Sequence, residues 1–184
     1  IGMTSLPPDS DVLEEKIRRA VVSFQGKPDY KGGEVFLFVL EDTEHHTLVG
    51  SAAIYAHVGL KHPFYSYKLS TIVQAHDALD VYSKQRVLHM VNDYTSATEI
   101  GSLFLMPNYR RDGIGQFLAR SRYLMMAQFP ELFDDRVISE IRGPLDSRGD
   151  SPFYDNFMFH FFQMGFARAD YIRATQGGQF IADL

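Results

Sequence analysis

A run of apolar residues that turns directly into a glycine-marked helix most restricts how this chain can fold. Residues 100–106 are apolar and β-prone, Pro107 and Asn108 predict a turn, and the pattern over 113–129 predicts an amphipathic helix. The expected apolar stripe of that helix consists of Ile114, Phe117, Leu118, Ser121, Leu124 and Met125. A strand that leads straight into a helix favours a mixed α/β fold.

The turn before this helix has the composition of an anion-binding loop. Gly113 and Gly115 let the backbone approach a ligand closely. The unpaired N–H groups at a helix start, with the helix dipole behind them, bind phosphate oxygens, and Arg110 could add a charge-assisted contact. The alternative is a surface turn with two glycines, and the position between a strand and a helix favours the anion site over it.

The preceding part of the chain supplies a helix and several strands. Asp9 or Ser10 caps the start of the expected helix, and Gly26 is its expected stop. A polar loop over 27–33 follows. The expected strands are residues 35–40, 48–57, 65–71 and 87–91.

The last third of the chain is expected to add strands around one more helix. Residues 136–142 predict a short strand. Ser151 and Pro152 predict the start of a helix with Phe153, Phe157, Phe161 and Met164 on one face. Residues 165–166 are expected to end it and begin a final strand. The chain therefore predicts one domain over 1–184 with a mixed α/β (α+β) sheet.

The composition argues against several classes of function. Cysteine is absent from the 184 residues, which excludes disulfides, thiolate metal sites and a cysteine nucleophile within them. The seven histidines show no ligand pairing at helical spacing, so no metal site is expected. A net charge of −5 argues against nucleic acid as the main partner. Without a signal-like opening or a membrane-length apolar run, a cytoplasmic protein is expected.

Two landmarks resemble the GNAT superfamily of acyl-CoA N-acyltransferases. The first is Arg110-x-x-Gly113-x-Gly115 after an apolar strand, and the second is Met164-Gly165-Phe166 after an aromatic helix. The resemblance implies that the central strand splays from its neighbour and that the pantetheine arm pairs with its edge over 103–106. The implied acyl-CoA-binding residues are Leu103, Phe104, Leu105, Arg110, Gly113, Ile114 and Gly115.

Further segments, taken in order, resemble the arginine N-succinyltransferase family over nearly the whole chain. They are residues 4–7, 39–42, 63–67, 92–93, 99, 102–105, 140–143, 151–153 and 180–184. The resemblance implies transfer of succinyl from succinyl-CoA to the α-amino group of L-arginine, in arginine catabolism. It implies succinyl-CoA as an acyl-donor substrate with no tightly bound cofactor, and Leu103 as the CoA-site leucine. A membrane or nucleic acid is not an expected partner, whereas an oligomer of like or unlike subunits is.

The chain departs from these families in two respects. The family polypeptide begins earlier and continues further, so its first strand and C-terminal part are expected to be missing here. The histidine that serves as the family's proton donor belongs to that C-terminal part and is expected beyond Leu184. Many GNAT enzymes also carry a tyrosine acid four residues before the Gly-Phe landmark, where this chain has Phe161. A phenyl ring cannot donate a proton, which is compatible with an acid supplied from elsewhere.

Four polar residues are candidates for substrate chemistry. Glu99 and Glu140 could take the proton of an ammonium or bind a guanidinium, or they could be strand-end carboxylates in salt bridges. Arg142 could hold a carboxylate, or pair with Glu140 or Asp146. Tyr67 could line the substrate side, or pack in the core. The alternative functions are an acetyl-CoA-dependent GNAT enzyme acting on another amine, and a non-catalytic CoA-binding or structural subunit.

Overall fold

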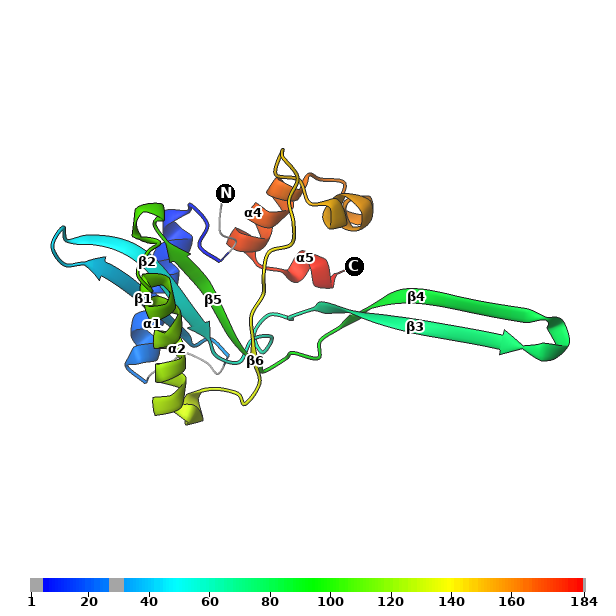
Figure 1. The fold of residues 1–184 in the computed structure, drawn as a ribbon, viewed down its shortest axis with the longest axis horizontal. Coiled ribbons are helices and arrows are strands. Elements are labelled where there is room, and N and C mark those ends of the chain that lie inside the picture. Colours follow the sequence, from blue (N-terminus) through cyan, green and yellow to red (C-terminus); the bar gives the residue numbers. More distant parts are fainter. Residues whose placement is uncertain (1–4, 27–31, 184) are drawn as a thin grey trace.

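The computed structural model describes residues 5–26 and 32–183 and contains two separate sheets (Figure 1). One has four strands in the order β1-β2-β5-β6, and the other pairs β3 with β4. The strands are β1 Val35–Asp42, β2 Thr47–Tyr55, β3 Ser66–His76, β4 Val81–Val91, β5 Thr98–Leu105 and β6 Val137–Ile138. The helices are α1 Ser10–Phe24, α2 Ile114–Gln128, α3 Phe159–Phe162, α4 Phe166–Gln176 and α5 Gln179–Ala182. The predicted mixed α/β fold is confirmed.

The four-stranded sheet is mixed, and its second strand is buried on both faces at Ala52, Ala53 and Ile54. β1 and β2 pair antiparallel, as do β2 and β5, whereas β5 and β6 are parallel. Phe36, Ile54 and Ala56 form the buried cluster on one face, and Met125 and Met126 of α2 pack against it. Adjacent residues of a strand point to opposite faces, so α2 covers the face opposite to the one that carries Tyr55.

The predicted first helix is confirmed as α1. The Asp9 carboxylate accepts a hydrogen bond from the Val12 amide at 3.1 Å, which caps the helix start. At the other end, the Ser23 hydroxyl accepts the Val35 amide at 3.0 Å and so ties α1 to the first strand. Most of the polar loop predicted after this helix, residues 27–31, lies outside the described residues.

The strand–turn–helix unit is confirmed as β5 and α2, but the buried face of α2 differs from the predicted stripe. Leu118 is only 3% exposed, whereas Phe117 and Leu124 of the stripe are 67% and 71% exposed. Arg122 is buried instead. The sheet contacts the arc around Leu118 because Gly50 of β2 lets the helix approach so closely that a Cβ there would lie 2.9 Å from a Leu118 methyl carbon.

The strands expected within 65–71 and 87–91 are confirmed, and both are longer than the patterns indicated. β3 and β4 each contain 11 residues and pair in unbroken antiparallel register from Ser66↔Val91 to His76↔Val81. We call residues 66–91 the arm, because this hairpin projects far from the four-stranded sheet (Figure 1). A short 3₁₀ turn, Asp77–Leu79, forms its tip.

The helix predicted at Ser151 is present, in a modified form. The Ser151 hydroxyl accepts the Tyr154 amide at 3.3 Å, as expected of a residue that caps a helix. The first part of the helix is a π-helix, Tyr154–Met158, that runs into α3. The preceding strand, predicted over 136–142, is only the two-residue β6.

The end of the chain contains the clearest error of the sequence-based prediction. The final strand predicted from residue 165 is wrong, because α4 and α5 occupy that stretch. Alanine, arginine and glutamine dominate α4 and favour a helix. Leu184 closes the segments that resemble the family and is the residue beyond which the family's proton-donor histidine is expected. It lies outside the described residues, so that expectation stays a prediction.

Candidate functional site

The central strand β5 has an open edge beyond its second residue. β6 pairs only with Thr98 and Glu99, so over residues 100–105 the strand's described hydrogen-bonding neighbour is β2 alone. Leu103 and Phe104 are exposed there, and Leu105 is buried. An open strand edge can accept an extended ligand as an added strand. The edge of β5 beside residues 103–105 is therefore open, as a ligand that pairs there would need.

Ser102 interrupts β5 with a bulge. Its φ is +50°, which is uncommon for a residue other than glycine. Ser51 lies opposite Phe104 and Ala53 opposite Gly101, so Ser102 and Leu103 together face the single residue 52 of β2. A bulge turns backbone N–H groups out of the regular ladder, which makes donors available to a ligand.

A chain of hydrogen bonds holds this bulge in place. The Tyr55 hydroxyl lies 2.6 Å from the Ser102 hydroxyl and accepts a hydrogen bond from Lys16 Nζ at 2.8 Å. The Ser51 hydroxyl donates to the Ser102 carbonyl at 3.0 Å. The Lys16 ammonium also lies 4.9 Å from the centroid of the Tyr55 ring. Residues from α1, β2 and β5 thus fix the one irregular position of the central strand.

Glu99 lies beside this chain of hydrogen bonds and has a perturbed acidity. It faces Tyr55 across the ladder, and its burial, with the negative charge of Glu140 as the second cause, raises its pKa to about 7. The positive charges of Arg173 and Lys16 oppose this shift of the pKa. A carboxyl group that titrates near neutral pH is suited to accept a proton as a general base.

Three residues near Glu99 line an open hollow that Glu99 itself does not line. A hollow of about 470 Å³ is lined by Lys16, Tyr55 and Arg173, together with the carboxylate-bearing residues Asp11 and Glu15. Arg173 of α4 also lies 3.7 Å from Glu140, between solvent-exposed side chains. The two glutamates that the sequence singled out separately are therefore brought into one electrostatic cluster by α4.

The loop before α2 presents backbone donors. Asp112 and Gly113 both have left-handed backbone angles, with φ of +51° and +76°. Within the described chain, the amides of residues 112, 113, 115 and 116 donate no hydrogen bond to protein atoms. These unpaired amides at the start of a 15-residue helix fit the oxygens of a phosphate group. Arg110 donates from Nε to the Leu105 carbonyl at 2.9 Å and so ties the loop to β5.

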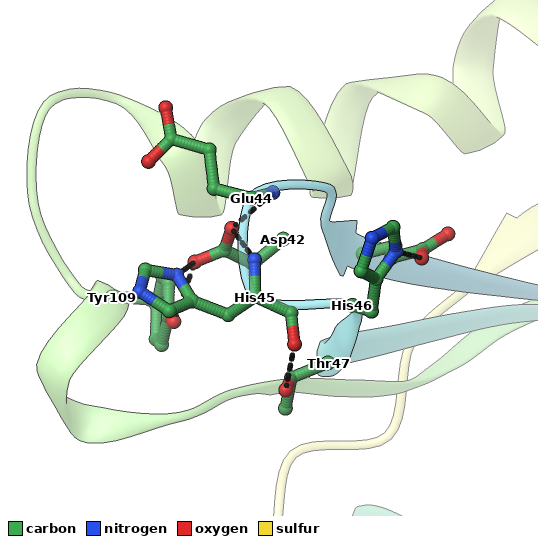
Figure 2. A network of polar contacts seen from close by, with 7 residues as sticks. Asp42, Glu44, His45, His46, Thr47 and Tyr109 are labelled. Carbon is green, nitrogen blue, oxygen red and sulfur yellow. Dashed lines mark hydrogen bonds and ion pairs between the residues drawn. The ribbon is translucent and has the colours of Figure 1, made fainter.

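A network around Asp42 anchors the same loop to the turn between β1 and β2 (Figure 2). Tyr109 donates its hydroxyl to Asp42 Oδ2 at 2.7 Å, and the His45 ring lies 2.9 Å from the same carboxylate oxygen. The Tyr109 hydrogen bond, followed by that of His45, holds the Asp42 pKa well below its usual range, and the same hydrogen bond raises the Tyr109 pKa. A hollow of about 430 Å³ lies between this turn and Gly113.

The two weaker candidates lie in packing positions. Arg142 bonds Asp170 of α4 at 2.6 Å, and its guanidinium lies 5.7 Å from the centroid of the Phe166 ring. That partner is neither of the two carboxylates considered from the sequence. Tyr67 donates its hydroxyl to the Met158 sulfur at 3.4 Å and packs against the aromatic helix, and burial raises its pKa. The structure thus places Tyr67 in the packing role that was its alternative.

Several polar residues of the site were not recognised from the sequence. Lys16 and Tyr55 are separated by 39 residues, and Tyr55 and Ser102 by 47. Asp42 and Tyr109 are 67 residues apart. No local pattern signals such pairs, although Asp42 at the end of an apolar run does indicate a turn.

Among the described residues, no three metal-binding side chains cluster, and no helix is long and apolar enough to cross a membrane.

Comparisons with known proteins give consistent matches. The family model described as arginine N-succinyltransferase beta subunit matches residues 1–184. The arginine N-succinyltransferase of Yersinia pestis (strain Pestoides F) is 44% identical over 184 residues, which are 100% of this chain and 52% of that protein. The one from Escherichia coli O139:H28 (strain E24377A / ETEC) is 41% identical over 183 residues, 100% of this chain and 53% of its own length.

A solved structure is similar in fold as well as in sequence. Arginine/ornithine succinyltransferase subunit AI from Pseudomonas aeruginosa superposes with a TM-score of 0.86 at 35% identity. The superposition covers 93% of this chain and 52% of that chain. This chain therefore spans about half the length of the curated relatives it matches.

Proposed function

Because this chain belongs to the arginine N-succinyltransferase beta subunit family, we propose that it forms the acyl-CoA-binding unit of an enzyme that transfers succinyl from succinyl-CoA to the α-amino group of L-arginine. The observation that carries this proposal is the open edge of β5, which leads into a helix start with unpaired amides. This enzyme would act in arginine catabolism, in the cytoplasm, and the descriptions of the family as a beta subunit and of the similar structure as subunit AI favour a subunit of an oligomer.

The acyl donor would lie along β5 and end at α2. The amides of residues 112, 113, 115 and 116 would hold the pyrophosphate, with Gly113 in the left-handed conformation that the loop needs. The pantetheine arm would pair with the open edge beside Leu103, Phe104 and Leu105. Ile114 and Gly115 begin the helix at that point, and Arg110 ties the loop to the strand. Succinyl-CoA would be consumed as a substrate and would not remain as a resident cofactor.

The chemical step would be direct attack of the amine on the thioester. Glu99 would take one proton from the substrate ammonium, since its pKa of about 7 lets it act near neutral pH. The free amine would form the new C–N bond at the carbonyl carbon, and N–H groups at the Ser102 bulge would stabilise the oxyanion. The nitrogen would lose its second proton to solvent as the tetrahedral intermediate collapses. Breaking the C–S bond would release CoA thiolate, which takes its proton from a group that the family places beyond Leu184.

The substrate amine would be placed by the hollow beside Glu99. Carboxylates bind a guanidinium in a bidentate manner, and Glu140 is the candidate on this side of the cluster. Arg142, bonded to Asp170, is the candidate for a carboxylate of arginine or of the succinyl group. These residues are proposed together as one acyltransferase unit within the single domain over 1–184.

Calorimetric titration of the chain with succinyl-CoA, repeated with acetyl-CoA, tests the proposal. Gly113→Val forces a β-branched side chain into a left-handed conformation and should weaken succinyl-CoA binding at least about tenfold. The matched control is Gly26→Val, because Gly26 is also left-handed with an empty Cβ position but follows the end of α1. An equal loss of succinyl-CoA affinity in Gly113→Val and Gly26→Val would contradict the placement of the pyrophosphate at the loop before α2.

The same titration separates the alternatives. Tighter binding of acetyl-CoA than of succinyl-CoA would favour an acetyltransferase acting on another amine. If neither succinyl-CoA nor acetyl-CoA gave a heat of binding, a structural subunit would be favoured. The supporting observation for that alternative is Phe161 in place of the tyrosine acid. Preference for succinyl-CoA would support the proposed activity.

A further inference from the structure

The arm of residues 66–91 is a two-stranded sheet that projects without a third strand. In the described part of the chain, neither outer edge of β3 or β4 is hydrogen-bonded to another strand. An isolated two-stranded hairpin is at best marginally stable in water, and a further strand or a helix is needed for stability. Here a helix covers only the root, where Tyr67 packs against Phe153 and Phe157.

One face of the arm carries large apolar side chains, interrupted by two cations. Because side chains alternate along a strand, the register places Leu69, Val73, Tyr82, Leu88 and Met90 on the same face as Tyr67, with Lys84 and Arg86 between Tyr82 and Leu88. The five apolar side chains are exposed, with Tyr82 at 70% and Val73 at 54%. The root of this face meets the aromatic helix, whose Phe153 and Phe161 remain about half exposed. A group of exposed apolar side chains bordered by polar ones is typical of a protein interface.

The two edges of the arm differ in charge. Residues 69–75 of β3 contain neither charged residues nor proline or glycine. β4 carries Lys84 and Arg86 on either side of Gln85. An antiparallel pairing of two β4 strands centred there would place these cations against each other, and like charges directly opposite are destabilising. The uncharged edge of β3 is therefore the one suited to pair with an identical strand.

We propose that two copies of this chain pair through their arms, with β3 antiparallel to β3 about a two-fold axis at Ile72. This centring places Thr71 of one copy opposite Val73 of the other, and Leu69 opposite Ala75, without a charged pair in the uncharged run. The result is a four-stranded sheet in the order β4-β3-β3-β4, and a two-fold axis makes the contact self-complementary.

The same pairing brings apolar side chains of the two copies together. An antiparallel arrangement brings the tip of each arm to the root of the other, so that Val73 and Tyr82 approach the exposed Phe153 and Phe161 of the second copy. Apolar side chains near the tip of each arm are then covered by the half-exposed stripe of the other copy's aromatic helix. This assembly is independent of the proposed acyl transfer.

Single cysteines test this geometry against a clean background, because the chain has no cysteine. At the two-fold axis, Ile72→Cys lies directly opposite its symmetry mate, within the Cα separation that a disulfide needs. Gln85→Cys is the matched control, since Gln85 lies opposite Ile72 within the same arm. In the proposed sheet the two Gln85 positions are about 14 Å apart, three strand spacings. Mild oxidation should cross-link Ile72→Cys into a dimer and leave Gln85→Cys monomeric.

Sedimentation equilibrium supplies the second readout. The unmodified chain should be dimeric, and Ile72→Lys should raise the dimer dissociation constant at least about tenfold by opposing like charges. Gln85→Lys should leave it unchanged, and circular dichroism would verify that both variants are folded. A monomeric unmodified chain would overturn the proposal. The proposal would also be overturned if no single cysteine at positions 70–74 formed a cross-linked dimer, or if Gln85→Cys cross-linked as fully as Ile72→Cys.

Discussion

Replacing Glu99 by glutamine should remove a pH-dependent loss of stability that the structure assigns to this carboxyl group. Glu99 titrates near pH 7 in the folded chain and near 4.5 when unfolded, because burial and Glu140 disfavour its charge. Between these values the folded chain holds a proton that the unfolded chain has released. Stability is therefore highest below the lower value and falls as the pH rises toward 7. Glutamine has the shape of the protonated form and no such dependence.

The expected size follows from the two pKa values. One pKa unit corresponds to 1.36 kcal/mol, so the difference between 4.5 and about 7 costs the native protein roughly 3 kcal/mol by pH 8. Urea unfolding of the native protein and Glu99→Gln at pH 5 and pH 8 measures this. Other titrating groups cancel when the two proteins are compared at each pH. Relative to the native protein, the unfolding free energy of Glu99→Gln should be higher at pH 8 than at pH 5 by most of these 3 kcal/mol.

Two neighbouring charges give controls of opposite sign. Glu140→Gln removes a negative charge that raises the Glu99 pKa, so the gain from Glu99→Gln should shrink in that background. Arg173→Gln removes a positive charge that lowers the Glu99 pKa, so the gain should grow. The Glu140–Arg173 contact is itself exposed and contributes little to stability. If Glu99→Gln changed the unfolding free energy equally at pH 5 and pH 8, the assigned pKa would be refuted. If the stability gain from Glu99→Gln were larger in the Glu140→Gln background, the contribution of the Glu140 charge to that pKa would be refuted.

Two further predictions concern α2 and its preceding loop. Leu118→Ala should cost about 3 kcal/mol in urea unfolding because the side chain is buried beneath α2, whereas Leu124→Ala, also in α2 but exposed, should change stability by less than about 0.5 kcal/mol; similar costs would contradict the observed face. Tyr109→Phe should raise the Asp42 pKa toward its ordinary 3.8, followed by NMR titration of the carboxyl carbon, since the tyrosine hydrogen bond is the main cause of the lowered pKa. An unchanged titration midpoint would mean that His45 and the turn amides hold the carboxylate by themselves.

Local patterns predicted the parts of the fold that depend on neighbouring residues. The cap at Asp9, the strand runs and the β5–turn–α2 unit are all written within short stretches, and each is present. The buried face of α2 was not predictable in the same way, because Gly50 on another strand decides which arc of the helix the sheet contacts. The final strand was predicted from residues 165–166, which were expected to end the aromatic helix, and the helix propensity of the following residues prevailed over it.

The candidate site likewise has one part that a local pattern indicates and another that depends on residues far apart in the sequence. The amide-lined helix start is local, so the glycines were enough to indicate it. The pKa of Glu99 depends first on its burial and then on the charges of Glu140, Arg173 and Lys16, which α1, α4 and the chain after β6 bring together. The roles assigned to the individual site residues remain predictions, which the titrations above would decide.

The bulge at Ser102 lets β5 carry one residue more than the facing stretch of β2 without turning over the side chains that follow. Before it, Glu99 and Gly101 share the face of Tyr55; after it, Phe104 lies on the same face with Ser51, and Leu105 points beneath α2 beside Gly50. A descendant that lost Ser102 and kept its pairing with β2 would therefore leave Phe104 and Leu105 on their present faces. It would lose the irregular backbone at the open edge, which the proposed oxyanion contacts need. The loss of this single residue would therefore affect the chemistry of the edge more than the packing of the sheet.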